Sequence, residues 1–326
     1  MCSNASKCRR EAGTKPEAGK QGSGLSAAHR RAIRQVEIRT RRLVNTLFSG
    51  DYKSSFKGRG IEFLDLREYL PGDDVRTIDW NVSARYGLAR AGGYHPFVKK
   101  FAEERELVVM LVVDASGSSR FGTAGTLKLE QSALLAATLA FSAIRNNDKV
   151  GLVFFSDRVE RYVPPRKGRS HVLRLIRDIL YFEPEGRGTE PGRALEFLMN
   201  VVKRRAVVFL VSDFIGPGFA PEAFRAPLGI AARRHDLIAV SVTDPAEEEL
   251  PRLGLVDLED AETGEVVTVA AGDPAVRRAL TRTRAEEREA RDALFRRLGV
   301  DHIPVRTDEE FTGRLHRFFQ QRAGRR

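Results

Sequence analysis

The feature that most constrains the fold is a series of short apolar runs separated by segments with helical periodicity. Strands of a parallel sheet covered on both faces are buried on both sides, so they read as continuous apolar runs rather than as an alternating pattern. The sequence therefore predicts an α/β fold with a doubly wound, mostly parallel sheet of the Rossmann type. The predicted strands are 107–113, 150–155, 206–211, 236–242 and 302–305, with an edge strand at 158–163 beside the second.

Helical periods fill the connections between these strands. The predicted helices are 127–145, 168–181, 191–203 and 221–233. A hairpin is expected over 254–259 and 265–270, about the turn Glu262-Thr263-Gly264. Pro274 opens a long charged helix that runs to about Leu298, and an amphipathic helix over about 308–322 closes the predicted domain.

The first 106 residues differ in character from the rest. Residues 1–24 are rich in Gly, Ser, Lys and Ala and lack periodic apolar residues, which indicates a disordered leader. Ser26 can cap a helix to about Phe48, and short extended runs broken by turn signals follow. We therefore expect a basic leader over 1–24, a helix and β-rich element over 25–106, and the α/β domain over 107–322.

Composition argues against several classes of protein. The longest uncharged stretch, Gln131–Ile144, is too short and too polar to cross a membrane, and the polar N-terminus lacks the apolar segment of a secretory signal. The only cysteines, Cys2 and Cys8, lie in the leader, so neither a disulfide nor a zinc framework is expected to brace the fold. These features predict a cytoplasmic protein.

The net charge of +11 is concentrated between Met1 and Gly50. No aromatic residues are interleaved with these charges, so a solvated basic surface is favoured over a nucleic-acid site, and no nucleic-acid partner is expected. The six histidines are scattered and no Gly-x-Ser-x-Gly motif occurs, which argues against hydrolase chemistry. We expect a protein that is not an enzyme.

Polar side chains follow the apolar runs at the points where ligands bind to open α/β sheets. The first central run ends in Asp114-Ala-Ser116-Gly-Ser118, a later one ends in Ser212-Asp213, and the loop Gly186-Arg-Gly-Thr189 opens a helix. Carboxylates and hydroxyls are hard oxygen donors, which suit Mg²⁺ or Mn²⁺. The predicted metal ligands are Asp114, Ser116, Ser118, Thr189 and Asp213.

The alternative to a metal site is a set of helix caps. In that interpretation Asp114 and Asp213 cap neighbouring helices, and Thr189 caps the helix that begins near Pro191. Each residue alone is more often a cap than a ligand. The five residues together, each at the end of a strand or the start of a helix, favour the metal site.

This arrangement resembles the metal-ion-dependent adhesion site of von Willebrand factor A domains. The stretch Asp148–Asp157 also resembles the second strand of that fold. The resemblance implies that Ser116 and Ser118 bind the metal directly, that Thr189 binds it directly or through water, and that the two aspartates bind mostly through water. An acidic side chain of a partner protein would complete the coordination.

Three upstream segments, Gly58–Phe63, Arg67–Arg85 and Lys99–Glu106, are similar to the bacterial domain-of-unknown-function family 58. The similarity covers about Ala28 to Arg322. It implies a partnership with a MoxR-type AAA+ ATPase, in which the chain acts as an adaptor or co-chaperone on an unidentified client protein in assembly or maturation. Two departures alter the rim of the site: Ser119-Arg120 follows the motif where Met is frequent, and Phe214 stands where Gly is frequent.

The β-rich element carries a second group of charged residues. The carboxylates near Pro71-Gly72 could form a catalytic group with neighbouring arginines, but a type II turn with charge pairs that lock the element to the main domain is favoured. Trp80 would be its apolar anchor. The candidate partner-binding residues of this element are Arg67, Asp73, Asp74, Arg76, Asp79 and Trp80.

Three functions follow, in order of preference. The first is a metal-dependent protein-interaction module that works with an AAA+ partner. The second is a nucleic-acid-associated basic protein, which steep salt dependence of binding would reveal. The third is a Mg²⁺-dependent phosphoryl-transfer enzyme, for which the sequence offers neither an evident nucleophilic aspartate nor an evident lysine at the site.

Overall fold

The computed structural model describes part of the chain in detail. The described residues are 34–38, 40, 56, 62–86, 96–102, 106–123, 127–248, 252 and 254–325. The predicted leader over 1–24 lies outside them, as does most of the predicted helix between Ser26 and Phe48. Among the described helices, none is both long and apolar enough to cross a membrane.

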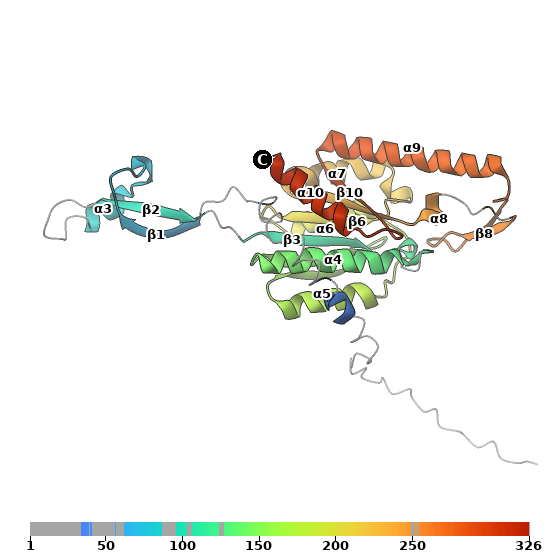
Figure 1. Ribbon diagram of the computed structural model, residues 1–326, viewed down its shortest axis with the longest axis horizontal. Helices are drawn as coiled ribbons and strands as arrows, with labels where there is room; N and C mark the ends of the chain where they lie inside the picture. Colours follow the sequence, from blue (N-terminus) through green and yellow to red (C-terminus); the bar gives the residue numbers. More distant parts are fainter. Residues whose placement is uncertain are drawn as a thin grey trace, which may run out of the picture.

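A six-stranded sheet forms the centre of the molecule (Figure 1). Its strand order is β10-β7-β6-β3-β4-β5, and every neighbouring pair is parallel except β4 with β5. This arrangement confirms the predicted fold class. The strands are β3 (Val108–Asp114), β4 (Lys149–Phe155), β5 (Val159–Arg166), β6 (Val207–Ser212), β7 (Asp236–Thr243) and β10 (Asp301–Arg306).

Helices cover both faces of this sheet. One apolar cluster joins the sheet to α4 (Lys128–Arg145), α5 (Arg169–Tyr181) and α10 (Thr312–Gly324). A second cluster joins the opposite face to α6 (Pro191–Val201), α7 (Pro221–Arg234) and α9 (Pro274–Leu298). The sheet therefore lies between two helical layers, as the continuous apolar runs of the sequence predict.

Strand β3 shows how the two cores divide its side chains. Val109, Leu111 and Val113 enter the cluster with α4, whereas Met110 and Val112 enter the cluster with α6 and α7. Successive side chains of a strand point to opposite faces, so a strand that is buried on both faces needs apolar residues at every position. All five of these side chains are fully buried, which places the end of β3 at a rigid point of the fold.

The β-rich element is built on an antiparallel pair, β1 (Glu62–Glu68) and β2 (Phe97–Ala102). The Pro71-Gly72 turn has the hydrogen bond from Asp73 N to Leu70 O (3.0 Å) and a φ of 109° at Gly72, as expected for a type II turn. A short 3₁₀ helix, Val75–Thr77, and the helix α3 (Trp80–Tyr86) follow it. The sequence did not predict α3.

Two expectations about this element are wrong. Among the described residues, Arg67 binds Asp73 (2.6 Å) and Lys99 binds Asp79 (3.1 Å), so these two charge pairs lie within the element and do not lock it to the main domain. Trp80 is 61% exposed and is therefore not an apolar anchor. Asp74 accepts a hydrogen bond from Arg76 N (2.9 Å) and caps the 3₁₀ helix, which is a local structural role.

Candidate metal centre

The centre of the site is formed by the carboxyl ends of two neighbouring strands. β3 ends at Asp114 and β6 ends at Ser212, which Asp213 follows. Ser212 Oγ donates a hydrogen bond to Asp114 Oδ2 at 2.6 Å. Both aspartates are 5% exposed, so the fold places two carboxylates close together in a largely buried position. Such an arrangement is costly unless a cation lies near them.

The loop after β3 turns back toward these carboxylates. Asp114 Oδ1 accepts a hydrogen bond from Ser116 N (2.9 Å), and the hydroxyl oxygens of Ser116 and Ser118 are 3.1 Å apart. A 3₁₀ helix, Gly117–Arg120, begins within the loop. The alternate spacing of the motif thus directs two hydroxyls to one place, as the sequence predicts.

The loop that carries Thr189 is tied to both neighbouring strand ends. Gly117 N donates to Arg187 O (3.2 Å), and Glu190 N donates to Ser156 O beyond the end of β4 (2.8 Å). Helix α6 begins after Glu190 without a side-chain cap, so Thr189 does not act as the cap of this helix. Its hydroxyl instead donates to Glu262 Oε1 at 2.5 Å.

A lysine that the sequence interpretation missed lies in the same cluster. Lys128 is the first residue of α4, and its side chain is 2% exposed. Its Nζ is 2.7 Å from Asp213 Oδ2 and 2.5 Å from Glu247 Oε1, on the short helix α8 (Pro245–Glu248). Burial alone would lower the pKa of Lys128, but attraction to the two carboxylates outweighs burial and raises it. Lys128 therefore keeps its positive charge at neutral pH.

Glu262 is the second residue that the interpretation missed. It lies at the tip of the hairpin formed by β8 (Val256–Glu259) and β9 (Val266–Val269), far along the chain from the other site residues. Burial raises the pKa of its carboxyl group, and the nearby charge of Asp213 adds to this, although the hydrogen bond from Thr189 opposes it. The site thus includes a carboxylate from a separate structural element.

The electrostatics of the cluster favour a further positive charge. Burial and the neighbouring Asp213 raise the pKa of Asp114 to about 7. Burial also raises the pKa of Glu247, in spite of its contact with Lys128. Lys128 contacts two of the four acidic side chains, Asp213 and Glu247, so it is the ammonium of a site that also holds Asp114 and Glu262. The donor set of carboxylate and hydroxyl oxygens is of the kind that Mg²⁺ or Mn²⁺ prefers, and a metal held there would share Asp213 with Lys128.

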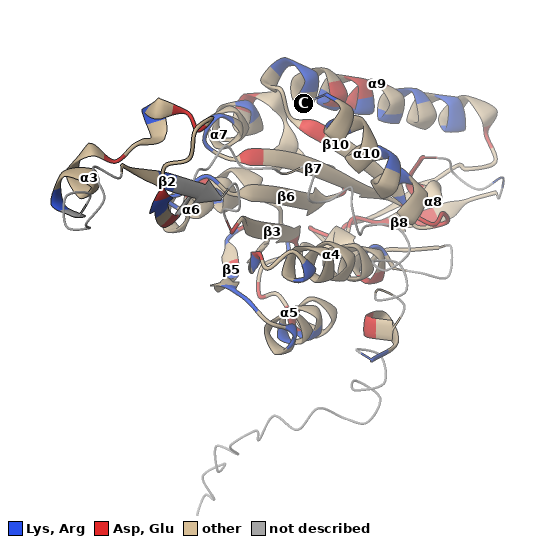
Figure 2. Ribbon diagram, turned by 60° about the vertical axis from the view of Figure 1, so that its left-hand side comes forward, with Lys and Arg blue, Asp and Glu red and all other residues tan. Residues whose placement is uncertain are grey.

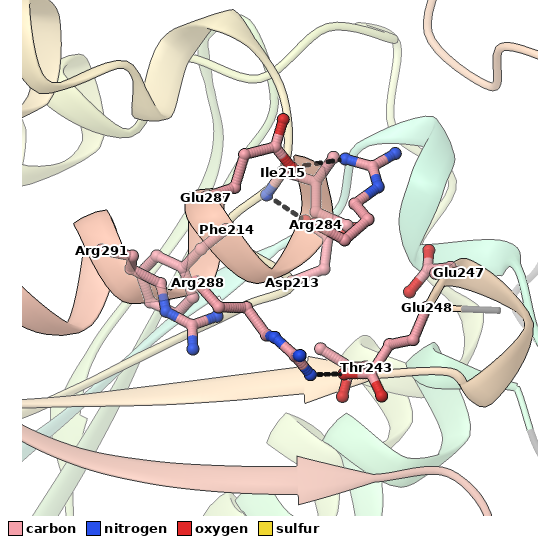
Figure 3. A pocket seen from close by; sticks show the side chains of 10 residues that line it. All are labelled: Asp213, Phe214, Ile215, Thr243, Glu247, Glu248, Arg284, Glu287, Arg288 and Arg291. Carbon is pink, nitrogen blue, oxygen red and sulfur yellow. Dashed lines mark hydrogen bonds and ion pairs between the residues drawn. The ribbon is translucent and has the colours of Figure 1, made fainter. Parts of the chain in front are cut away.

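A pocket opens beside Asp213 (Figure 3). Helix α9, which contains many Arg residues (Figure 2), contributes three arginines to its lining. Arg284 binds Glu287 (2.8 Å), Arg291 binds Asp292 (2.9 Å), and Arg288 binds Glu248. Each of these arginines pairs with a carboxylate. The pocket is therefore lined by ion pairs at the rim of the site.

The two missed residues differ in how far the sequence could have revealed them. Lys128 begins the helix that follows the loop carrying Ser116 and Ser118. A helix that follows a strand starts at the edge of the sheet where the parallel strands end. Its position could therefore have been inferred. Glu262 approaches the site only through the path of the hairpin, and no local pattern in the sequence indicates that path.

Comparisons with known proteins place the chain in a family. Residues 65–290 match the model of the family described as Protein of unknown function DUF58. Uncharacterised proteins of Mycobacterium tuberculosis and Mycobacterium bovis are each 33% identical to the chain over 293 residues, which covers 89% of this chain and 89% of each relative.

Among solved structures, the chain is similar to a conserved hypothetical protein, BatB, from Bacteroides thetaiotaomicron, with 18% identity, a TM-score of 0.42 and coverage of 67% of this chain and 99% of that one. It is also similar to a von Willebrand factor type A protein from Catenulispora acidiphila, with 12% identity, a TM-score of 0.37 and coverage of 70% and 43%. The family match spans more than half of the chain, and the mycobacterial relatives match along most of their length. The chain therefore belongs to the family of proteins of unknown function DUF58.

Proposed function

We propose that this protein is a metal-dependent protein-interaction module. Asp114, Ser116, Ser118, Thr189 and Asp213 would hold Mg²⁺ or Mn²⁺ at the carboxyl edge of the sheet. The observation that carries the proposal is the pair of buried carboxylates, Asp114 and Asp213, beside hydroxyl oxygens at the ends of adjacent strands. A divalent cation there would balance negative charge of the two carboxylates that Lys128 alone does not balance.

The donor set supports binding rather than catalysis. A metal held mainly by hydroxyls and shared carboxylates keeps a position that an acidic side chain of another protein can occupy at short range. The family resemblance adds a partner class, a MoxR-type AAA+ ATPase, with the chain as its adaptor or co-chaperone on a client protein. Both the metal dependence and the ATPase partnership are proposals that a direct experiment can test.

The test is an affinity capture with the full chain as bait. Wild-type protein in Mg²⁺, wild-type protein in EDTA, and Asp114→Asn in Mg²⁺ would each be incubated with a purified MoxR-type ATPase encoded near a member of this family. We expect retention only by the wild-type protein in Mg²⁺. Asn keeps the shape of Asp but removes a charge, so the variant isolates the electrostatic contribution of the carboxylate.

A matched control is Asp257→Asn, in the exposed strand β8. It changes one carboxylate of the same type that is not a proposed ligand and that accepts a hydrogen bond from Thr268 across the hairpin (2.6 Å), a bond that Asn can also accept. The variant should retain the ATPase as well as the wild-type protein does. Equal retention in Mg²⁺, in EDTA and by Asp114→Asn would overturn the metal-dependent proposal. The exposed β-rich element around Trp80 would then be the surface to test for partner binding.

Phosphoryl transfer remains the alternative, because Lys128 supplies the site lysine that the sequence interpretation did not find. The lysine is bound to Asp213 and Glu247, however, and its side chain is buried, so release of one carboxylate would have to precede contact with a phosphate. Hydrolysis of p-nitrophenyl phosphate in Mg²⁺ by the wild-type protein, abolished in Lys128→Met, would favour the enzyme over the interaction module.

A further inference from the structure

We propose that Glu262 is a carboxylate ligand of the metal site that the chain itself supplies. It would take the place that an acidic side chain of a partner would otherwise occupy. This inference rests on the metal site proposed above, and it adds a ligand that neither the strand ends nor the motif contains. A partner would then bind by displacing Glu262.

The position of the hairpin tip supports this role. Thr189 Oγ1, one of the proposed metal ligands, donates a hydrogen bond to Glu262 Oε1 at 2.5 Å. A Cβ atom added to Gly216, just after Asp213, would lie 3.4 Å from the same oxygen. The carboxylate therefore lies between the Thr189 loop and the segment after β6, among the side chains that would surround the metal.

The backbone of the hairpin tip also lies close to the loop after β3, which carries Ser116 and Ser118. A Cβ atom at Gly117 would lie 2.1 Å from Ala261 O, which is shorter than any van der Waals contact. Glycine at this position, between Ser116 and Ser118, is what lets the hairpin approach the loop. The sequence thus provides both a carboxylate at the tip and the space that it needs beside the site.

The turn holds Glu262 in a defined conformation. Asp260 Oδ1 accepts hydrogen bonds from Glu262 N (2.8 Å) and Thr263 N (3.2 Å). Gly264 N donates to Asp260 O (2.7 Å), and Asp260 N donates to Glu265 O (2.8 Å), which close the turn. Because the backbone of the turn is ordered by its own contacts, Glu262 is presented to the site at little further entropic cost.

The rest of the hairpin is poorly anchored to the domain. Val266 is 58% exposed, Val267 is 52% exposed and Leu258 is 39% exposed. Little apolar surface of these strands is buried, so the tip contacts at Thr189 and Gly117 help to hold the hairpin in place, together with the buried Ala271 just after β9. A contact of this kind can be exchanged for a carboxylate from another protein, and displacement would release a strand pair with exposed apolar side chains.

Binding of Mn²⁺ alone tests the role of Glu262 without any partner. The full chain would be titrated with Mn²⁺, with free Mn²⁺ followed by electron paramagnetic resonance and coordinated water followed by water-proton relaxation. We expect Glu262→Ala to bind Mn²⁺ about tenfold more weakly than the wild-type protein, by analogy with the loss of other groups that support a metal. The bound ion should also gain one exchangeable water, because water replaces the carboxylate.

Glu265→Ala is the matched control, since Glu265 lies in the same turn and is exposed. It should leave both the affinity and the water count unchanged. If Asp114→Asn loses Mn²⁺ but Glu262→Ala keeps the wild-type affinity and water count, Glu262 is not a ligand and the metal site itself stands. If the wild-type protein binds no Mn²⁺ at this site, the metal site and the role of Glu262 both fail.

Discussion

At the residue after Asp213 the backbone adopts an unusual conformation. Phe214 has a φ of 58°, in the left-handed region that side chains other than glycine avoid. Its ring is buried and packs against Phe219 and Phe295, with centroid distances of 5.0 and 5.3 Å. The aromatic contacts offset the backbone strain, which explains how Phe occupies a position where the family resemblance leads one to expect Gly.

This balance predicts the order of stability of two variants. Phe214→Ala removes the ring and should lower the free energy of unfolding by about 3–5 kcal/mol. Phe214→Gly removes the ring but relieves the backbone, so it should be at least as stable as Phe214→Ala, measured by urea denaturation. At the buried helical residue Phe224 the order should reverse, with Gly about 1 kcal/mol worse than Ala. The same order at both positions would contradict the assignment of strain to Phe214.

A buried histidine predicts how stability depends on pH. His235 is fully buried and its Nδ1 accepts a hydrogen bond from Ala206 N (3.3 Å). Burial, and then the nearby charges of Arg234 and Arg205, lower its pKa to about 4. The unfolded chain therefore binds a proton in a range where the folded chain does not. Stability from this group is present above the ordinary histidine pKa of about 6.5 and is lost as the pH falls toward 4.

Between pH 7 and pH 5 this histidine should reduce the free energy of unfolding by about 2 kcal/mol. His235→Asn keeps a hydrogen-bond acceptor but does not titrate, so its stability should fall less over the same interval. His302 has a pKa lowered to about 4, chiefly by burial, and its contribution should persist in the variant. Urea denaturation at the two pH values measures the difference, and parallel losses for the two proteins would exclude His235 as the cause.

At the scale of the element, α4 determines the charge of the site. Its first residue, Lys128, is buried between Asp213 and Glu247, while the remainder of the helix packs on the sheet. The start of a helix that follows a strand is set by the sheet beneath it, so this ammonium has little freedom to move. The element therefore supplies a fixed cation to a site whose other members come from a strand end, a short helix and several loops.

Replacing this cation should have two opposite effects. Lys128→Met leaves Asp213 and Glu247 without their ammonium, so the free energy of unfolding in EDTA should fall by about 3–5 kcal/mol. The same variant should bind Mg²⁺ more tightly, since the metal no longer competes with a fixed positive charge. Thermal unfolding and calorimetric titration measure the two effects.

Lys149→Met provides the control for this experiment. Lys149 binds Glu106 at 2.9 Å, and both side chains are more than 40% exposed. A surface ion pair contributes about 1 kcal/mol or less, so this variant should remain close to the wild-type protein. An equal loss of stability in the two variants would indicate that the burial of Lys128 has no special energetic role.

At the scale of the whole molecule, the metal should act as a stabilising ligand. A cation that binds the folded chain and not the unfolded one adds about 2.7 kcal/mol when present at a hundred times its dissociation constant. For a chain of this size, this corresponds to a rise in Tm of roughly 4 °C. Asp114→Asn should abolish the rise while Asp257→Asn preserves it, as measured by calorimetry in Mg²⁺ and in EDTA. A rise of the same size in Asp114→Asn would place the stabilising metal elsewhere.

The sequence by itself determined the main sheet and most of its helices. Runs such as 206–211 are apolar at every position, and only a strand buried on both faces requires that pattern, so β6 and its neighbours could be located closely. The spacing in Asp114, Ser116 and Ser118 was equally informative, because residues that follow a strand directly must lie at the edge of the sheet. The apolar pattern of each segment and the direction of the strands were enough to predict the sheet and the position of this motif.

Tertiary structure alone decided the features that depend on contacts between distant segments. The exposure of Trp80 and the confinement of the charge pairs of Arg67 and Lys99 to their own element depend on what packs against that element, which composition does not reveal. The approach of Glu262 to Thr189 joins positions 73 residues apart. Hydrophobic periodicity reports the face that an element buries, but the path of a hairpin over the surface is set by packing between whole elements, and only the folded chain contains that information.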